Sequence, residues 1–257
     1  MDVRAWPTPF IAGVSLTYDG ARPEHLDHAI PELERARLKG TFFIESGACA
    51  ERIAEWRGAV ELGHELGNGF LSNSTDSDGL IPHWPSGTLE DECRDADELI
   101  ETITGRKPTS FAHPCVRTEW SESGIPVVSE ILGTTIMRIN DEALAPFAAH
   151  YGCVRVPQDG FNPVPGFNPK RIRCYVADQL DGDSLCVLAH LGISQGAWVV
   201  FTFSGLRINP FLLDAHAQFV QWLAERRESV MVGTISEVVA GFGLSSVERG
   251  SAFKLSP

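Results

Sequence analysis

Short runs of β-favouring residues alternate with longer helical patterns along most of the chain, and this alternation limits the fold more than any other feature. Strands separated by helices of this length pair in parallel through right-handed crossovers. About seven such units suit a closed or nearly closed barrel better than an open sheet, so we expect an α/β barrel. The expected strands are residues 13–18, 41–44, 64–67, 109–112, 134–139, 153–157, 198–203 and 230–234. The expected helices are residues 24–38, 48–62, 89–104, 210–227 and 236–242, with one more within 177–194 and one between 112 and 134.

Length and charge limit the organisation and the partners of the chain. A chain of 257 residues suits one barrel, so we expect residues 1–257 to form a single domain. The net charge of −13 repels nucleic acid and anionic membranes, and no Lys/Arg run offsets it locally. Residues 1–17 lack the pattern of a secretory signal, which makes a cytoplasmic location the default expectation and leaves an exported mature form open.

Cysteine and glycine spacing argues against several kinds of site. The six cysteines are dispersed without a C-x-x-C pair, which favours reduced core thiols over a zinc knuckle. A bridge between Cys153 and Cys174 stays open. No glycine-rich or Walker-type loop follows an expected strand, so we expect no nucleotide cofactor.

Three segments, each at the end of an expected strand, contain the polar residues that are candidates for a functional site. They read Val-Ser-Leu-Thr-Tyr-Asp-Gly at 14–20, Gly-His-Glu-Leu-Gly-Asn-Gly-Phe-Leu-Ser-Asn at 63–73, and Trp-Val-Val-Phe-Thr-Phe-Ser-Gly at 198–205. Together with connecting text such as Lys-Gly-Thr-Phe-Phe-Ile at 39–44, and in this order, they resemble the polysaccharide deacetylases. This family is also called the NodB-homology proteins or carbohydrate esterase family 4 (CE4). The resemblance implies a distorted (β/α)7 barrel with its site at the carboxyl ends of the strands.

The resemblance also assigns roles to positions, and most of these positions lack the residue that the role needs. Asp19 stands at the general base. Gly20 stands where the family has a metal-binding Asp, and Gly69 and Asn73 stand where it has two metal-binding histidines. Ser204 stands at the general-acid histidine. The resemblance therefore implies a degenerate site with no bound metal and no cofactor.

A further departure concerns the partner of the base. The family's Arg-x-Pro motif steadies the base with an arginine, and this chain has Ala112 at the arginine position. We therefore expect Asp19 to have no guanidinium partner and its charge to be held by backbone N–H groups or water.

Loss of the metal removes most of the chemical activation. A bound zinc ion lowers the pKa of its water from ~15.7 to ~7 and polarises the amide carbonyl. That shift corresponds to on the order of 12 kcal/mol of proton affinity, whereas one positioned base contributes a factor of ~10²–10⁴ in rate. A serine hydroxyl at position 204 is also a poor proton donor to a departing amine.

Other polar residues are candidates with a plain structural alternative. His113 is a possible catalytic residue, weighed evenly between lining the cleft and a structural role. His64 is more in keeping with a hydrogen-bonded scaffold histidine than with a ligand, although a replacement site of Asp19, His64 and His113 stays open. We expect three helix histidines to be solvated, namely His25, His28 and His216. The residues expected to contact a ligand are Tyr18, Asn68, Phe70, Trp84 and Ser204, with Phe161 and Phe167 as further aromatics that could stack on sugars.

These observations support one leading hypothesis and two alternatives. The leading one is a polysaccharide-deacetylase-like protein that has lost metal-dependent deacetylation and keeps a cleft for a carbohydrate or related small ligand. The second is an active, metal-independent hydrolase of a small amide, cyclic imide or ester that uses Asp19 as base. The third is a regulatory or assembly subunit whose ligand is another protein, and the sequence leaves the oligomeric state open.

Overall fold

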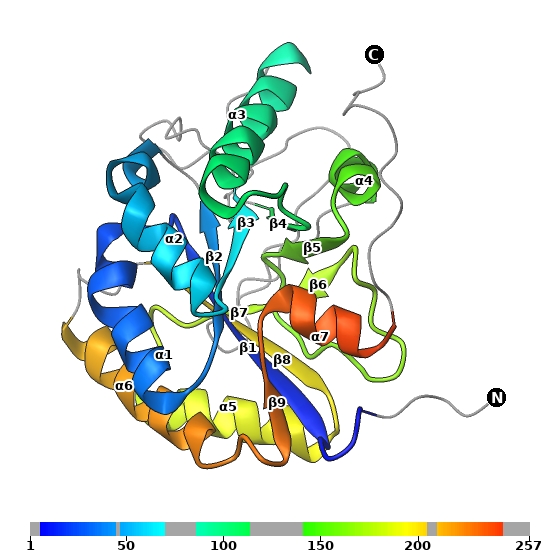
Figure 1. The fold of residues 1–257 in the computed structure, drawn as a ribbon. Helices are drawn as coiled ribbons and strands as arrows, with labels where there is room; N and C mark the ends of the chain where they lie inside the picture. Colours follow the sequence, from blue (N-terminus) through cyan, green and yellow to red (C-terminus); the bar gives the residue numbers. More distant parts are fainter. Residues whose placement is uncertain (1–5, 45–46, 70–85, 114–140, 205–209, 244–257) are drawn as a thin grey trace.

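The computed structural model describes residues 6–44, 47–69, 86–113, 141–204 and 210–243 (Figure 1). Its strands pair in parallel in the order β6, β5, β4, β3, β2, β1, β8, β7, and β9 pairs with β1. The strands are β1 (Ala12–Asp19), β2 (Gly40–Ile44), β3 (Glu65–Asn68), β4 (Ser110–Ala112), β5 (Cys153–Val156), β6 (Ile172–Arg173), β7 (Tyr175–Val176), β8 (Trp198–Phe203) and β9 (Val230–Val232).

The helices follow the strands along most of the described chain. They are a π-helical turn at His25–Ala29, α1 (Ile30–Ala36), a 3-10 helix at Gly47–Arg52, α2 (Ile53–Glu61), α3 (Ser86–Thr104), α4 (Asp141–His150), α5 (Gly182–Ser194), α6 (Pro210–Ala224) and α7 (Ile235–Gly241). Figure 1 shows α1, α2, α5 and α6 along one side of the sheet. Pro31 lies in the first turn of α1, where a missing N–H costs nothing.

Strands β6 and β7 close the sheet into a barrel. A single residue, Cys174, separates them. On one side Ile172 pairs with Arg155 of β5, and on the other Val176 pairs with Thr202 of β8. Residues 172–176 therefore connect the two edges, and the sheet is a nearly closed parallel barrel, which confirms the fold class expected from the sequence.

The alternation of side chains along β1 separates two environments. All eight residues of this strand are buried, because it lies between the helices and the barrel interior. Val14, Leu16 and Tyr18 join the apolar cluster beneath the helices. The side chains of Ser15, Thr17 and Asp19, which alternate with these, point into the barrel. Thr17 and Asp19 both contact the guanidinium of Arg155 from the far side of the barrel.

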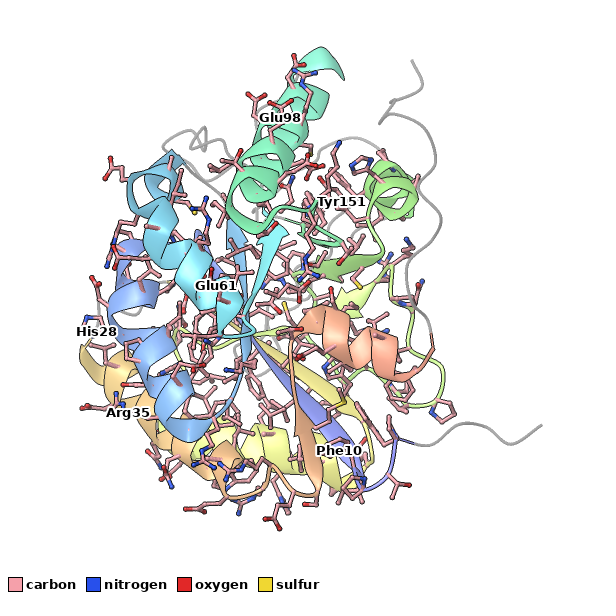
Figure 2. The ribbon with its side chains drawn as sticks, viewed as in Figure 1. Phe10, His28, Arg35, Glu61, Glu98 and Tyr151 are labelled. Carbon is pink, nitrogen blue, oxygen red and sulfur yellow. The ribbon has the colours of Figure 1, made fainter. Side chains whose placement is uncertain are left out.

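Two of the helix histidines are buried, and the prediction that they are solvated is wrong. His25 and His216 both have 0% exposed surface. His216 joins its Nε2 to the Tyr18 hydroxyl at 2.8 Å and its Nδ1 to Glu32 at 2.6 Å. Polar partners on β1 and α1 thus compensate for its burial, which a helical pattern alone does not reveal. His28 is exposed as predicted, on the outer surface of the molecule (Figure 2).

The structure has three elements that the sequence did not predict, namely two short strands and one helix. Strands β6 and β7 have two residues each, too short for an alternation pattern to mark them. Helix α4 contains Pro146, a residue that usually ends a helix, yet its Leu144 and Phe147 pack against Phe111 in a separate apolar cluster. The predicted strand at 134–139 and the helix before it lie outside the described residues.

Two further features concern the described residues alone. No disulfide joins Cys153 and Cys174. Within the ranges given above, no helix has the length and apolar character needed to span a bilayer.

Candidate functional site

The carboxyl ends of three adjacent strands bring the motif positions together. The N–H of Gly20, directly after β1, donates to the carbonyl of Phe43 at 2.9 Å. The N–H of Gly69, directly after β3, donates to the carbonyl of Ile44 at 2.9 Å. Gly20 and Gly69 therefore flank the end of β2, and Asp19 precedes Gly20. Asn73, Phe70 and Trp84 lie outside the described residues.

Asp19 forms a buried ion pair with an arginine that the sequence analysis did not identify. Nη2 of Arg155 lies 2.7 and 2.8 Å from the two carboxylate oxygens of Asp19. Nη1 of the same guanidinium lies 3.2 Å from Oγ1 of Thr17, whose hydroxyl donates to the carbonyl of Phe201 at 2.8 Å. Asp19 is 6% exposed and Arg155 is 2% exposed, so solvent screens this pair weakly.

The expectation that Asp19 lacks a guanidinium partner is therefore wrong, and the strand register gives the reason. Ala112 of β4 and Arg155 of β5 are direct partners in the parallel ladder, so their side chains point to the same face. Adjacent strands lie about 4.8 Å apart, a difference that a long arginine side chain covers. An arginine from the neighbouring strand thus reaches the carboxylate that the family's arginine holds. The signal in the sequence was a charged residue inside the apolar run Cys153–Val156.

The backbone at position 20 suits glycine and disfavours a metal-binding aspartate. Gly20 has a φ of +97°, a conformation that L-residues rarely adopt. A Cβ atom placed there lies 2.8 Å from Nε of Arg22. The next residue, Ala21, also has a positive φ, of 41°. The turn after β1 therefore has a conformation in which an aspartate would be strained.

The donor atoms at this end of the barrel do not fit a zinc site. Zinc takes its ligands from His, Cys, Asp and Glu side chains, usually three or four of them. Gly20 and Gly69 have no side-chain donor, and both oxygens of Asp19 contact Arg155. Within the part of the chain that the structure describes, no cluster of three or more such residues has a geometry that could hold a metal ion.

Ser204 lies at the carboxyl end of β8, beside Asp178. The backbone N–H of Ser204 donates to Oδ1 of Asp178 at 2.9 Å. Asp178 follows β7 by two residues and places a second carboxylate at this end of the barrel. Asp178 was not predicted as a site residue, because the region after residue 177 was expected to contain a helix and β7 was not recognised.

The two histidines proposed for a replacement site do not converge on Asp19. The ring of His113 packs edge-on against Phe147 of α4, with 5.8 Å between centroids, and so faces the helical layer. His64 precedes β3 at the opposite end of the barrel, where its Nδ1 accepts the N–H of Gly40 at 3.1 Å and its Nε2 lies 3.1 Å from Glu34. Burial, with the nearby charge of Lys39, lowers the pKa of His64 to about 4. His64 has the scaffold role that the sequence favoured.

Tyr18 and Asn68 also face the helical layer. Tyr18 has no exposed surface, and burial raises the pKa of its hydroxyl well above the usual value, with Glu32 adding to the effect. The side-chain nitrogen of Asn68 lies within 2.9 Å of the Cys93 carbonyl, Asp97 and the Tyr151 hydroxyl. Their positions do not support the prediction that these two residues contact a ligand. Phe161 and Phe167 likewise pack on Tyr175 and Trp198 in apolar clusters.

A cavity of about 390 Å³ lies at the other end of the barrel. Its lining includes His64, Glu65 and Thr109, at or next to the amino ends of β3 and β4, and Ser236 of α7. The carboxylate of Glu65 accepts the backbone N–H of Ser236 at 3.1 Å and the Ser236 hydroxyl at 2.5 Å. These bonds attach α7 to the barrel, so the polar groups here have structural partners.

Comparison with known proteins agrees with this architecture. Residues 11–122 match the family described as polysaccharide deacetylase. A Bacillus subtilis (strain 168) protein named YlxY is 30% identical over 91 residues, which are 35% of this chain. The chain spans about a quarter (27%) of the length of that curated relative.

Solved structures of similar fold include an enzyme and a pseudoenzyme. A putative polysaccharide deacetylase from Mycobacterium smegmatis has a TM-score of 0.63 at 13% identity, over 100% of this chain and 98% of that one. The peptidoglycan deacetylase PdaC from Bacillus subtilis has a TM-score of 0.55 at 15% identity, over 95% and 94%. BA3943 from Bacillus anthracis, described as a CE4 family pseudoenzyme, has a TM-score of 0.52 at 18% identity, over 88% and 65%. At these identities the likeness establishes the fold. Residues 11–122 thus match the polysaccharide deacetylase family, and the barrel described above is the fold that this family's solved structures share.

Proposed function

We propose that this protein is a degenerate polysaccharide deacetylase, which has lost metal-dependent deacetylation and binds a carbohydrate or related small ligand at the carboxyl ends of its strands. The observation that carries the proposal is the pair of glycines at two positions where the family binds its metal. Gly20 has a φ of +97° and Gly69 is buried beside it around the end of β2. Neither position offers a side-chain donor atom.

The loss of a metal weakens catalysis by more than the remaining residues supply. Lewis-acid activation of water corresponds to on the order of 12 kcal/mol of proton affinity. Asp19, although steadied by Arg155, contributes as one positioned base, a factor of about 10²–10⁴. A metal-independent hydrolase would need another group to polarise the carbonyl and another proton donor in place of Ser204. We therefore do not put that alternative forward.

The retained polar groups support a binding role. A buried ion pair seldom stabilises a fold more than apolar residues of the same size. Asp19 and Arg155 persist at the barrel end, and Asp178 lies beside Ser204. A set of charged and polar groups at a site whose described residues do not fit a metal ion is in keeping with ligand recognition.

The structural neighbours make a loss of activity a known outcome on this fold. BA3943 is described as a CE4 family pseudoenzyme, and a mutant of it is described as having restored enzymatic activity. This relation suggests the matched control for the present chain, in which the missing metal ligands are put back together.

The test measures metal content, deacetylation and binding for the wild type and for a Gly20→Asp, Gly69→His, Asn73→His variant. After incubation with zinc and dialysis, we expect elemental analysis to give well below one zinc per wild-type chain and a clear increase in the variant. Calorimetry with the chitin tetramer chitotetraose, in chelator, should show saturable binding to the wild type. Stoichiometric tight zinc with release of acetate by the wild type would reject the loss of activity. Absence of binding to every sugar of a neutral panel would reject the ligand half.

A further inference from the structure

Two threonines that lie side by side in the barrel have opposite hydrogen-bonding states. Thr17 of β1 and Thr202 of β8 are register partners, so both side chains point into the barrel. The Thr17 hydroxyl donates to the carbonyl of Phe201 and accepts from Arg155. The Thr202 hydroxyl is buried, with 2% of the residue exposed, and has no partner among the residues that the structure describes.

The state of Thr202 is unfavourable for a purely structural residue. A buried hydroxyl without a hydrogen-bond partner destabilises the fold, because it loses its hydration and gains no bond in return. Valine has nearly the same shape and lacks this unfavourable desolvation. The neighbouring interior positions of β8, Trp198 and Val200, are apolar members of the inner core. The position therefore keeps a hydroxyl that the packing of the described residues does not use.

The unused hydrogen-bonding capacity lies next to the carboxylate of the candidate site. Asp19 is two residues beyond Thr17 on the same face of β1, and Ser204 directly follows the end of β8, two residues beyond Thr202. Strand spacing and rise place the Cβ positions of Asp19 and Thr202 about 8 Å apart, a span that one sugar ring with adjacent hydroxyls fills. Arg155 uses two of the roughly four acceptor positions of the Asp19 carboxylate, which leaves about two for a ligand.

We propose that Thr202 contacts the ligand and that, with Asp19, it binds adjacent hydroxyls of an uncharged sugar. This inference rests on the proposed function and adds the chemistry of the ligand. A carboxylate accepts hydrogen bonds and a threonine hydroxyl both donates and accepts, as a sugar diol requires. An anionic sugar is disfavoured, because the positive charge of Arg155 is already paired with Asp19 and Asp178 adds a second negative charge nearby. Arg155 acts as a positioning residue for Asp19.

The experiment compares Thr202→Val with Thr17→Val, a matched pair of substitutions on adjacent strands. Calorimetry uses three tetrasaccharides, namely chitotetraose, xylotetraose and the anionic tetragalacturonate, and thermal unfolding is followed without ligand. Thr202→Val should keep or raise the melting temperature, by up to about 5 °C, and weaken binding of the neutral sugar roughly 3- to 10-fold. Thr17→Val should lower the melting temperature by roughly 5–10 °C, because it removes bonds to Arg155 and Phe201.

The possible results test the proposed function, the role of Thr202 and the assigned ligand chemistry separately. Wild type that binds no neutral tetramer refutes the proposed function together with this inference. Wild type that binds while Thr202→Val binds with equal affinity refutes the role of Thr202 alone. If the melting temperature falls in Thr202→Val as much as in Thr17→Val, the Thr202 hydroxyl is structural, and its proposed role in ligand binding is refuted. Tighter binding of tetragalacturonate than of both neutral sugars refutes the assigned ligand chemistry.

Discussion

His25 makes the stability of this protein sensitive to acid in a way that one substitution removes. Its ring has no exposed surface, and Nδ1 accepts the backbone N–H of Arg22 at 3.1 Å. Nε2 has no hydrogen-bond partner within the described residues, so protonating the ring would create a buried positive charge without a hydrogen-bond acceptor at Nε2. Burial above all, then the charges of Arg22 and His216, lower the pKa of His25 from 6.5 to about 3.

The sign and size of the effect follow from proton linkage. Below pH 6.5 the unfolded chain binds a proton on this ring, and the folded protein does not until about pH 3. The stability contributed by the neutral ring is complete above pH 6.5 and falls with pH by about 1.36 kcal/mol per unit. Between pH 7 and pH 4.5 the loss from this one residue is on the order of 2–3 kcal/mol, a large part of the 5–15 kcal/mol of a typical protein.

The assay is urea unfolding at pH 7.0, 5.5 and 4.5, followed by tryptophan fluorescence, for wild type, His25→Gln and His28→Gln. Glutamine keeps an oxygen that can accept the Arg22 N–H and does not titrate. We expect the fall in unfolding free energy between pH 7 and 4.5 to be on the order of 2–3 kcal/mol smaller in His25→Gln than in wild type. His28 is exposed on the same turn, and its substitution should leave the pH dependence unchanged. His64 titrates equally in all three proteins, so its effect cancels. Equal pH dependence in wild type and His25→Gln would refute the reasoning.

Three further predictions concern the candidate site. Arg155→Met leaves the Asp19 carboxylate buried without its partner and should lower the unfolding free energy by about 3–5 kcal/mol in urea titrations, and adding Asp19→Asn should recover most of it. A double variant no more stable than Arg155→Met would contradict this. Ala112→Arg placed in an Arg155→Ala background should regain at least half of the stability lost by Arg155→Ala, because the two positions are register partners, and no regain would show that they are not equivalent. Gly20→Ala should cost about 1–2 kcal/mol because of its positive φ, whereas the control Gly58→Ala, inside α2 with open space around it, should gain about 0.5–1 kcal/mol. A loss of stability at position 58 equal to that at position 20 would speak against strain.

The repeated alternation of strands and helices was sufficient to predict the barrel, because each long element carries its own periodic pattern. The family resemblance, rather than the alternation, placed Asp19, Gly20, Gly69 and Ser204 at one end of the barrel, because it implies a site at the carboxyl ends of the strands. The alternation pattern did not reveal β6 and β7, because a strand of two residues is too short to show a periodic pattern. Without them, Asp178 had no strand to follow.

The partner of Asp19 was missed for a different reason. The motif places the arginine at position 112, whereas the guanidinium comes from position 155 on the next strand. A motif specifies a residue number, whereas an ion pair only requires that the two charged groups meet in space. An arginine side chain is long enough to reach Asp19 from either β4 or β5. His216 was missed similarly, because its partners Tyr18 and Glu32 are almost 200 residues away.

The five residues 172–176 have a consequence beyond barrel closure. Ile172 pairs with Arg155, and Val176 pairs with Thr202. On the closing side of the barrel, this one peptide therefore spans the distance between the strand that bears Arg155 and the strand that bears Thr202. Inserting or deleting a single residue there would shift one strand end against the other while leaving every side chain of the site unchanged, so the spacing of recognition groups can evolve separately from their identity.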